Sequence, residues 1–180
     1  MKNNSVSPTR HLIRFIFTVA IAGTLGGALG GALRGPAGTS LAFAGDPSQQ
    51  PPLGCTLTQG FWKNHEPEVL ALVPGSMNLG STAYTAAELD SILGQAVAGN
   101  ALLILAHQLI AAQLNDLNGA DVSGIAADLA NANSLIGSLV VPPIGAGSVD
   151  PSSVLGQQMV TVAATLDNFN NGNTSVPHCP

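Results

Sequence analysis

The densest group of residues able to do chemistry lies in the segment Thr58–His65, which reads Thr-Gln-Gly-Phe-Trp-Lys-Asn-His. It holds the only tryptophan of the chain and the only lysine or arginine after residue 44. In one interpretation, a small polar recognition surface beside an aromatic ring is formed by Trp62, Lys63, Asn64 and His65. In the other, Phe61 and Trp62 close one end of a helical bundle, and the polar residues after them bond loop backbone groups. We favour the second interpretation, because an aromatic pair is commonly core.

The three histidines after residue 44 are candidate metal ligands. Zinc takes three or four nitrogen, sulfur or oxygen ligands in tetrahedral geometry. His65, His107 and His178 are 42 and 71 residues apart, so they form no local ligand signature. His107 lies in an apolar helical run, where a histidine is more often buried and hydrogen-bonded. We therefore predict no metal and no other cofactor. The alternative is a small ligand- or metal-binding protein or hydrolase, built around Trp62, His65 and His107.

Other catalytic patterns are not found in the sequence. It has no Gly-x-Ser-x-Gly or Ser-x-x-Lys motif that would activate a serine. It also has no Walker A lysine after a glycine-rich loop, and no Gly-x-Gly-x-x-Gly after a strand. The sequence favours a non-enzymatic protein and suggests no catalytic residues.

The distribution of charge excludes two classes of partner. All ten acidic residues lie after position 44, where Lys63 is the only lysine or arginine, so that part of the chain has a formal charge of −9. Phosphate backbones and anionic lipid heads are bound by clusters of lysine and arginine. We therefore predict an acidic protein that binds no nucleic acid and, after signal cleavage, no membrane.

The first 44 residues have the order of a secretory signal peptide. A polar stretch with three basic residues precedes the uncharged segment Phe15–Leu33, and Ala42-Phe43-Ala44 then provides a cleavage site. We predict that residues 1–44 are a signal peptide cut before Gly45, and that the protein is secreted or periplasmic. The alternative is a retained membrane anchor, because nineteen uncharged residues could just span a bilayer.

Two cysteines bound the remaining chain. Because exported proteins reside in oxidising compartments, Cys55 and Cys179 are expected to form a disulfide. Residues 45–54 have little apolar surface to bury and read as a flexible leader. Residues 55–179 then form a single helical domain, closed end to end.

Between the cysteines, the hydrophobic pattern predicts an all-α bundle of four main helices and one or two short ones. The main helices are expected from the capping box at Thr85 to Gly99, from Ala101 to about Leu117, from Asp121 or Ser123 to Leu139, and from Pro151 to Asn171. The second is apolar nearly all round, so we place it at the buried centre. The fourth has the inner face Leu155, Met159, Val162, Leu166 and Phe169. A short helix is expected near Pro67–Val73, and Leu79–Tyr84 could be a short extended piece.

The segment Cys55–His65 resembles a recurring module of exported bacterial proteins whose core reads TQGxWKNH. Four later segments look like the same module, so the resemblance covers nearly all of residues 55 to 179: Gly99–Leu102, Ala106–Ala112, Val141–Pro143 and Pro177–Cys179. It implies an exported bacterial protein without an established activity. One departure is Glu66, because the module has proline directly after the histidine.

These observations together predict an exported module that acts through its surface, in the cell envelope, the extracellular matrix or a protein–protein contact. Residues 45–180 contain eleven asparagines and eight glutamines but few charges. A surface nearly free of lysine lacks one common guard against self-association. We therefore expect a protein partner or self-association.

Overall fold

A computed structural model of the chain describes residues 51–180. The predicted signal peptide and residues 45–50 of the predicted leader lie outside the described residues. In residues 51–180, six α-helices, one 3-10 turn and one hairpin follow one another. Their bounds are α1 (Gln59–Lys63), α2 (Glu66–Leu72), β1 (Ser76–Leu79), β2 (Thr82–Thr85), α3 (Ala86–Gly94), α4 (Ala101–Leu117), η2 (Ser123–Ile125), α5 (Ala126–Ile136) and α6 (Val154–Asn170).

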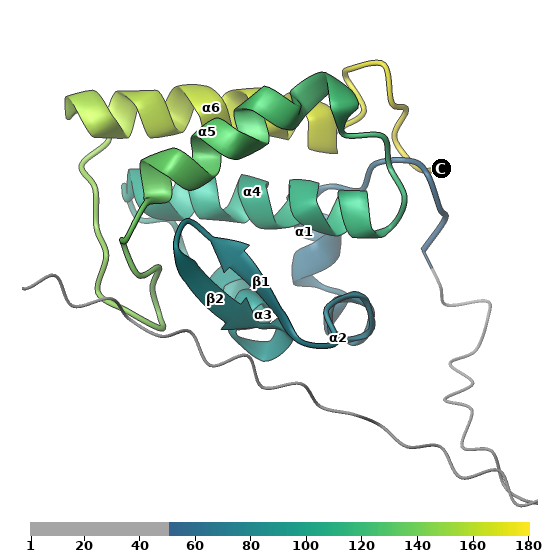
Figure 1. Ribbon diagram of the computed structural model, residues 1–180, viewed down its shortest axis with the longest axis horizontal. Helices are drawn as coiled ribbons and strands as arrows, with labels where there is room; N and C mark the ends of the chain where they lie inside the picture. Colours follow the sequence, from purple (N-terminus) through teal and green to yellow (C-terminus); the bar gives the residue numbers. More distant parts are fainter. Residues whose placement is uncertain (1–50) are drawn as a thin grey trace, which may run out of the picture. The chain divides into compact units, whose positions relative to one another are not determined.

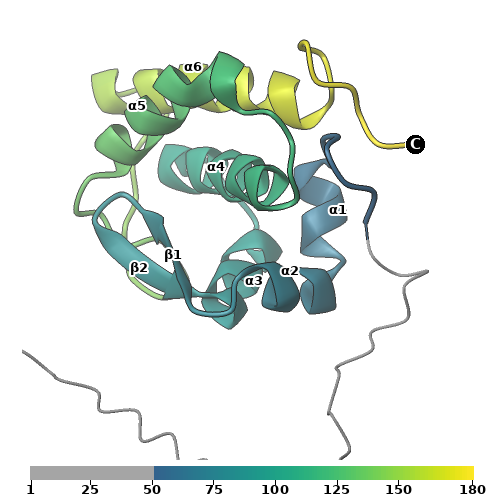
Figure 2. The ribbon, with the colours of Figure 1, turned by 45° about the vertical axis from the view of Figure 1, so that its right-hand side comes forward.

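Helix α4 lies at the centre of the domain. Helices α5 and α6 cover one side of it, and the hairpin, α2 and α3 lie against the opposite side, with α1 beside them (Figures 1 and 2). Twelve of its seventeen residues are buried, which is why its sequence is apolar nearly all round. The predicted bounds and central position of this helix are confirmed.

The prediction of an all-α fold is wrong in one element, the antiparallel hairpin of β1 and β2 (Figure 1). Its strands pair from Ser76 with Thr85 to Leu79 with Thr82, so Gly80 and Ser81 form a two-residue turn. Gly80 has a φ of +64°, which favours glycine at the first position of such a turn. Each strand has only four residues, so period-two alternation is too short to stand out in the sequence.

The C-terminal ends of two helices also differ from the prediction. The helix opened by the Thr85 capping box ends at Gly94 rather than Gly99, because Gln95 adopts extended backbone angles (φ −71°, ψ 143°). Ala98 and Gly99, with φ values of +43° and +74°, belong to the loop that follows. The helix opened by the 3-10 turn at Ser123 ends at Ile136 rather than Leu139. The capping box itself is present: the Thr85 hydroxyl accepts from the Glu88 N–H and the Glu88 carboxylate accepts from the Thr85 N–H.

The last helix begins at Val154, later than the predicted start at Pro151. Asp150 accepts from the backbone N–H of Ser152, and Ser153 is the residue that caps α6, through a bond from the N–H of Gly156. Leu155 therefore does not reach the inner face and is 37% exposed. The other four predicted inner residues, Met159, Val162, Leu166 and Phe169, are buried.

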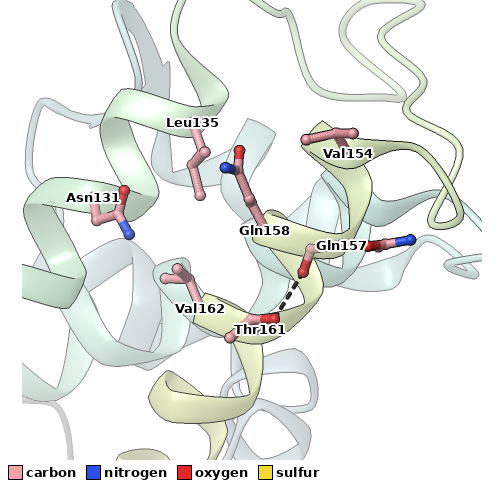
Figure 3. A pocket seen from close by; sticks show the side chains of 7 residues that line it. All are labelled: Asn131, Leu135, Val154, Gln157, Gln158, Thr161 and Val162. Atoms are coloured by element: carbon pink, nitrogen blue, oxygen red, sulfur yellow. Dashed lines mark hydrogen bonds between the residues drawn. The ribbon is translucent and has the colours of Figure 1, made fainter.

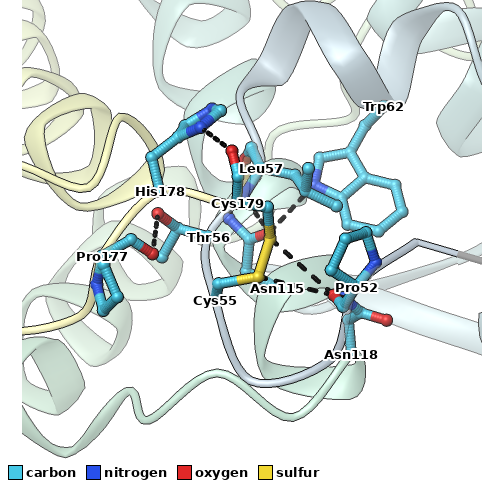
Figure 4. Close-up of a disulfide and its surroundings, with 10 residues drawn as sticks. All are labelled: Pro52, Cys55, Thr56, Leu57, Trp62, Asn115, Asn118, Pro177, His178 and Cys179. Atoms are coloured by element: carbon cyan, nitrogen blue, oxygen red, sulfur yellow. Dashed lines mark hydrogen bonds between the residues drawn. A yellow bond between two sulfur atoms is a disulfide. The ribbon is translucent and has the colours of Figure 1, made fainter.

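The predicted disulfide is confirmed and joins the two ends of the domain (Figure 4). The Cα atoms of Cys55 and Cys179 lie 5.1 Å apart although 124 residues separate them in sequence. Backbone bonds on either side reinforce the junction: the Thr56 N–H donates to the Pro177 carbonyl, and the Cys179 N–H donates to the Thr56 carbonyl. A disulfide indicates an oxidising, extracytoplasmic compartment.

In residues 51–180, no helix combines the length and the apolar character needed to cross a bilayer.

Candidate functional site

The motif Thr58–His65 folds into the short helix α1 and provides its own caps. The Thr58 hydroxyl accepts from the N–H of Phe61 at 3.1 Å. At the other end, the Asn64 amide donates to the Gly60 carbonyl at 2.7 Å, and Nδ1 of His65 donates to the Phe61 carbonyl at 2.7 Å. The rings of Phe61 and His65 stack with centroids 3.7 Å apart. The side chains of Thr58, Asn64 and His65 are therefore engaged within the motif itself.

Trp62 points away from this exposed turn and into the core, where it is fully buried. Its indole N–H donates to Oδ1 of Asn115, which also accepts from the Leu57 N–H (Figure 4). The Asn115 amide group donates to the Leu57 carbonyl at 2.9 Å and to Oδ1 of Asn170 at 3.0 Å. Asn115 thus uses both its acceptor positions and both its donors, which is the full capacity of an amide side chain.

The polar network continues from α4 into α6. Asn170 is fully buried, and its amide group donates to both the carbonyl and the side-chain oxygen of Gln108. We did not predict roles for Asn115 or Asn170. The sequence does carry a signal for Asn115, which is a polar residue on an otherwise apolar stretch of the central helix. A polar residue that is buried there needs a hydrogen-bond partner.

His107 is 6% exposed and lies on α4, facing α3. Its Nε2 donates to the Ile92 carbonyl at 2.8 Å. Loss of hydration lowers the pKa of His107; the bond to Ile92 opposes this effect, and the positive charge of Lys63 adds to it. His107 therefore serves as a neutral donor that joins two helices.

The three histidines each contact a different main-chain carbonyl. His65 bonds Phe61, His107 bonds Ile92, and the exposed His178 bonds Cys179. Across residues 51–180, no three histidine, cysteine or acidic side chains come together as a metal site. Lys63 is exposed at the end of α1.

A hollow that was not predicted lies between α5 and α6 (Figure 3). It has a volume of about 440 Å³ and is lined by Asn131, Leu135, Val154, Gln157, Gln158, Thr161 and Val162. We call it the α5–α6 groove. None of its lining residues is charged, and none belongs to the motif. The helical pattern identified both helices, but the hollow depends on how their faces meet in three dimensions.

Comparison of the chain with protein-family models, with curated proteins and with solved structures found no match. The fold itself defines a mostly helical domain with a small hairpin, closed by a disulfide between its ends. The relationship to exported bacterial proteins with the TQGxWKNH core stays a prediction.

Proposed function

We propose that the protein is an exported, non-enzymatic module that acts through its surface in a protein–protein contact, and that the α5–α6 groove is the contact surface. Export is supported by the signal-like pattern of residues 1–44 together with the disulfide, which forms in oxidising compartments.

One observation carries the proposal: two of the side chains best suited to chemistry are engaged inside the domain, and a hollow lined by polar and apolar side chains lies elsewhere. Trp62 and His107 are buried and bonded to the protein itself. In the groove, by contrast, the exposed amides of Asn131 and Gln158 have no hydrogen-bond partner within residues 51–180. Amides beside apolar side chains are typical of recognition surfaces, where they fix the orientation of a partner.

The alternative, a ligand-binding protein or hydrolase built around Trp62, His65 and His107, gains no support from these contacts. The donors of the three residues point to Asn115, to Phe61 and to Ile92. A catalytic pair requires a nucleophile and a base within hydrogen-bond reach of each other.

Site-specific photo-crosslinking in cells that export the protein tests the proposal. A photo-reactive amino acid replaces Gln158 in the groove or, as a control, Ala87, which is exposed on α3. We expect a discrete crosslinked product from position 158 and none from position 87. The variants Lys63→Ala and His65→Ala should leave this product unchanged. Equal products from positions 158 and 87, or loss of the product in both motif variants, would contradict the proposal.

A further inference from the structure

We propose that the partner bound at the α5–α6 groove is a second copy of this chain, seated groove against groove about a two-fold axis. The inference rests on the proposed function of the groove and names its partner. Three properties of the surface support it: its charge, the chemistry of its polar groups, and its apolar area.

The first property is the absence of charge from the lining of the groove. Residues 51–180 carry nine carboxylates and one lysine, a formal charge of −8, so two copies repel each other over most orientations. The acidic residues of the two helices, Asp128 and Asp167, do not line the groove. The groove lining itself therefore places no carboxylates face to face, which would cost binding energy; Asp128 lies one helical turn before Asn131 on the same face of α5.

The second property is self-complementarity. A two-fold axis brings the same patch of both copies together, so the patch as a whole must supply both hydrogen-bond donors and acceptors. Amides and hydroxyls both donate and accept hydrogen bonds, whereas carboxylates only accept and ammonium groups only donate. The polar groups of the groove are of the first type throughout: Asn131, Gln157, Gln158 and Thr161. The Thr161 hydroxyl already donates to the Gln157 carbonyl and the Gln157 amide to the Ser152 carbonyl, which leaves the amides of Asn131 and Gln158 fully open to a second copy.

The third property is exposed apolar surface on the same helix. Val154, which lines the groove, is 76% exposed. Helices α5 and α6 have 11 and 17 residues, so they are about 16 and 25 Å long and together about 20 Å wide. Their outer face measures roughly 400 Å² in projection, which suits a weak, reversible dimer rather than an obligate one.

Sedimentation velocity of the exported, disulfide-intact protein tests the inference. We expect a dimer whose fraction rises with protein concentration over roughly 0.02 to 1 mM, the range for a small interface. Thr161→Lys should raise the dissociation constant at least tenfold, because it buries an unpaired ammonium group from each copy in the contact. Ala87→Lys on α3 is the control with the same change of charge and should leave association unchanged.

Two further measurements identify the surface. A mixture of Thr161→Lys and Thr161→Glu chains should associate more tightly than either variant alone, because the introduced charges then attract. Added salt should tighten the wild-type dimer, because it screens the repulsion between two acidic copies. Thermal melting of each variant verifies folding, and Gln158→Lys replaces Thr161→Lys if that variant does not fold.

Several outcomes would overturn the inference. A wild-type chain that stays monomeric throughout excludes the second copy; if Gln158 still gives a discrete crosslink, the proposed function stands with a different partner. A dimer unaffected by Thr161→Lys excludes the groove as its interface. A dimer weakened by salt excludes contact between uncharged patches. If the groove gives neither a dimer nor a crosslink, the proposed function and the inference fail together.

Discussion

The indole N–H of Trp62 donates to the side-chain oxygen of Asn115 at 3.2 Å, and both side chains are fully buried. The bond connects α1 with the central helix α4, across 53 positions of sequence. The same Asn115 side chain holds both backbone groups of Leu57. The tryptophan of the motif is therefore placed by a single asparagine that also fixes the chain leading into the motif.

Replacement of Asn115 by leucine should lower the free energy of unfolding by about 3 kcal/mol or more. The substitution leaves the Trp62 N–H and both backbone groups of Leu57 buried without partners, and each such group costs about 1–3 kcal/mol. Urea denaturation measures the loss. Asn131→Leu, the same exchange at an exposed position of α5, should change stability by less than about 0.5 kcal/mol. Equal effects of the two substitutions would show that the buried network contributes little.

Removal of the disulfide should destabilise the domain strongly. For a bridge between residues 124 apart, the chain-entropy account gives about 4–5 kcal/mol. We expect Cys55→Ala with Cys179→Ala, or treatment with a reductant, to lower the melting temperature by several degrees. The reductant should have no further effect on the double variant. An unchanged melting temperature after confirmed reduction would contradict this expectation.

The stability of the domain should decrease as the pH falls below about 6.5. Burial holds the pKa of His107 below its ordinary value of 6.5, so the unfolded chain takes up a proton before the folded one does. The contribution of His107 is therefore fully present above pH 6.5 and is lost as the pH falls from there toward its folded pKa. Thermal melting between pH 7.5 and pH 5 measures the effect.

His107→Gln is the matched variant for this pH dependence. Its amide can still donate to the Ile92 carbonyl but does not titrate in this range. The variant should therefore have a flatter profile between pH 7.5 and pH 5. The carboxylates of Glu88, Asp121 and Asp150 affect the pH dependence of stability only at lower pH. Hydrogen bonds from Thr85, Ser123 and Ser152 lower their pKa from ordinary values of 4.5, 3.8 and 3.8. An identical slope in wild type and variant would assign the effect to other groups.

The two polar residues at the end of α1 should respond differently to alanine. His65→Ala removes the bond to the Phe61 carbonyl and the stacked ring, so we expect a loss of about 1 kcal/mol. Lys63 is exposed, so Lys63→Ala should stay within about 0.5 kcal/mol of wild type. Chemical denaturation compares them. If neither variant changes stability but both abolish the crosslink at position 158, the motif is a recognition surface instead.

The parts of the fold that depend on local chemistry could be predicted from sequence. Asn100 caps α4 and Asn118-Gly119 follows its last residue, so both of its ends carry local signals. The pairing of Cys55 with Cys179 followed from there being two cysteines in an exported chain. The hairpin at Gly80 could not be predicted, because each of its strands has only four residues and is too short to show the period-two alternation of a strand.

For the candidate site too, the sequence identified single residues but not their partners. The sequence identified Trp62 and His107 as notable, but their partners lie on other helices and only the fold brings them together. The groove between α5 and α6 depends on the exposure of Val154, which follows from the late start of α6 at Ser153. That start is set by Asp150, which uses its side chain in a turn before the helix begins.

The disulfide between the two ends of the domain also determines how the domain carries mechanical load. When a chain is held on one side of Cys55 and pulled on the far side of Cys179, the tension passes through the covalent bond between the two sulfur atoms. The helices and the hairpin lie inside the loop that this bond closes, so they bear none of that tension. Pulling on the chain from outside the two cysteines therefore leaves the domain folded until the bridge is reduced.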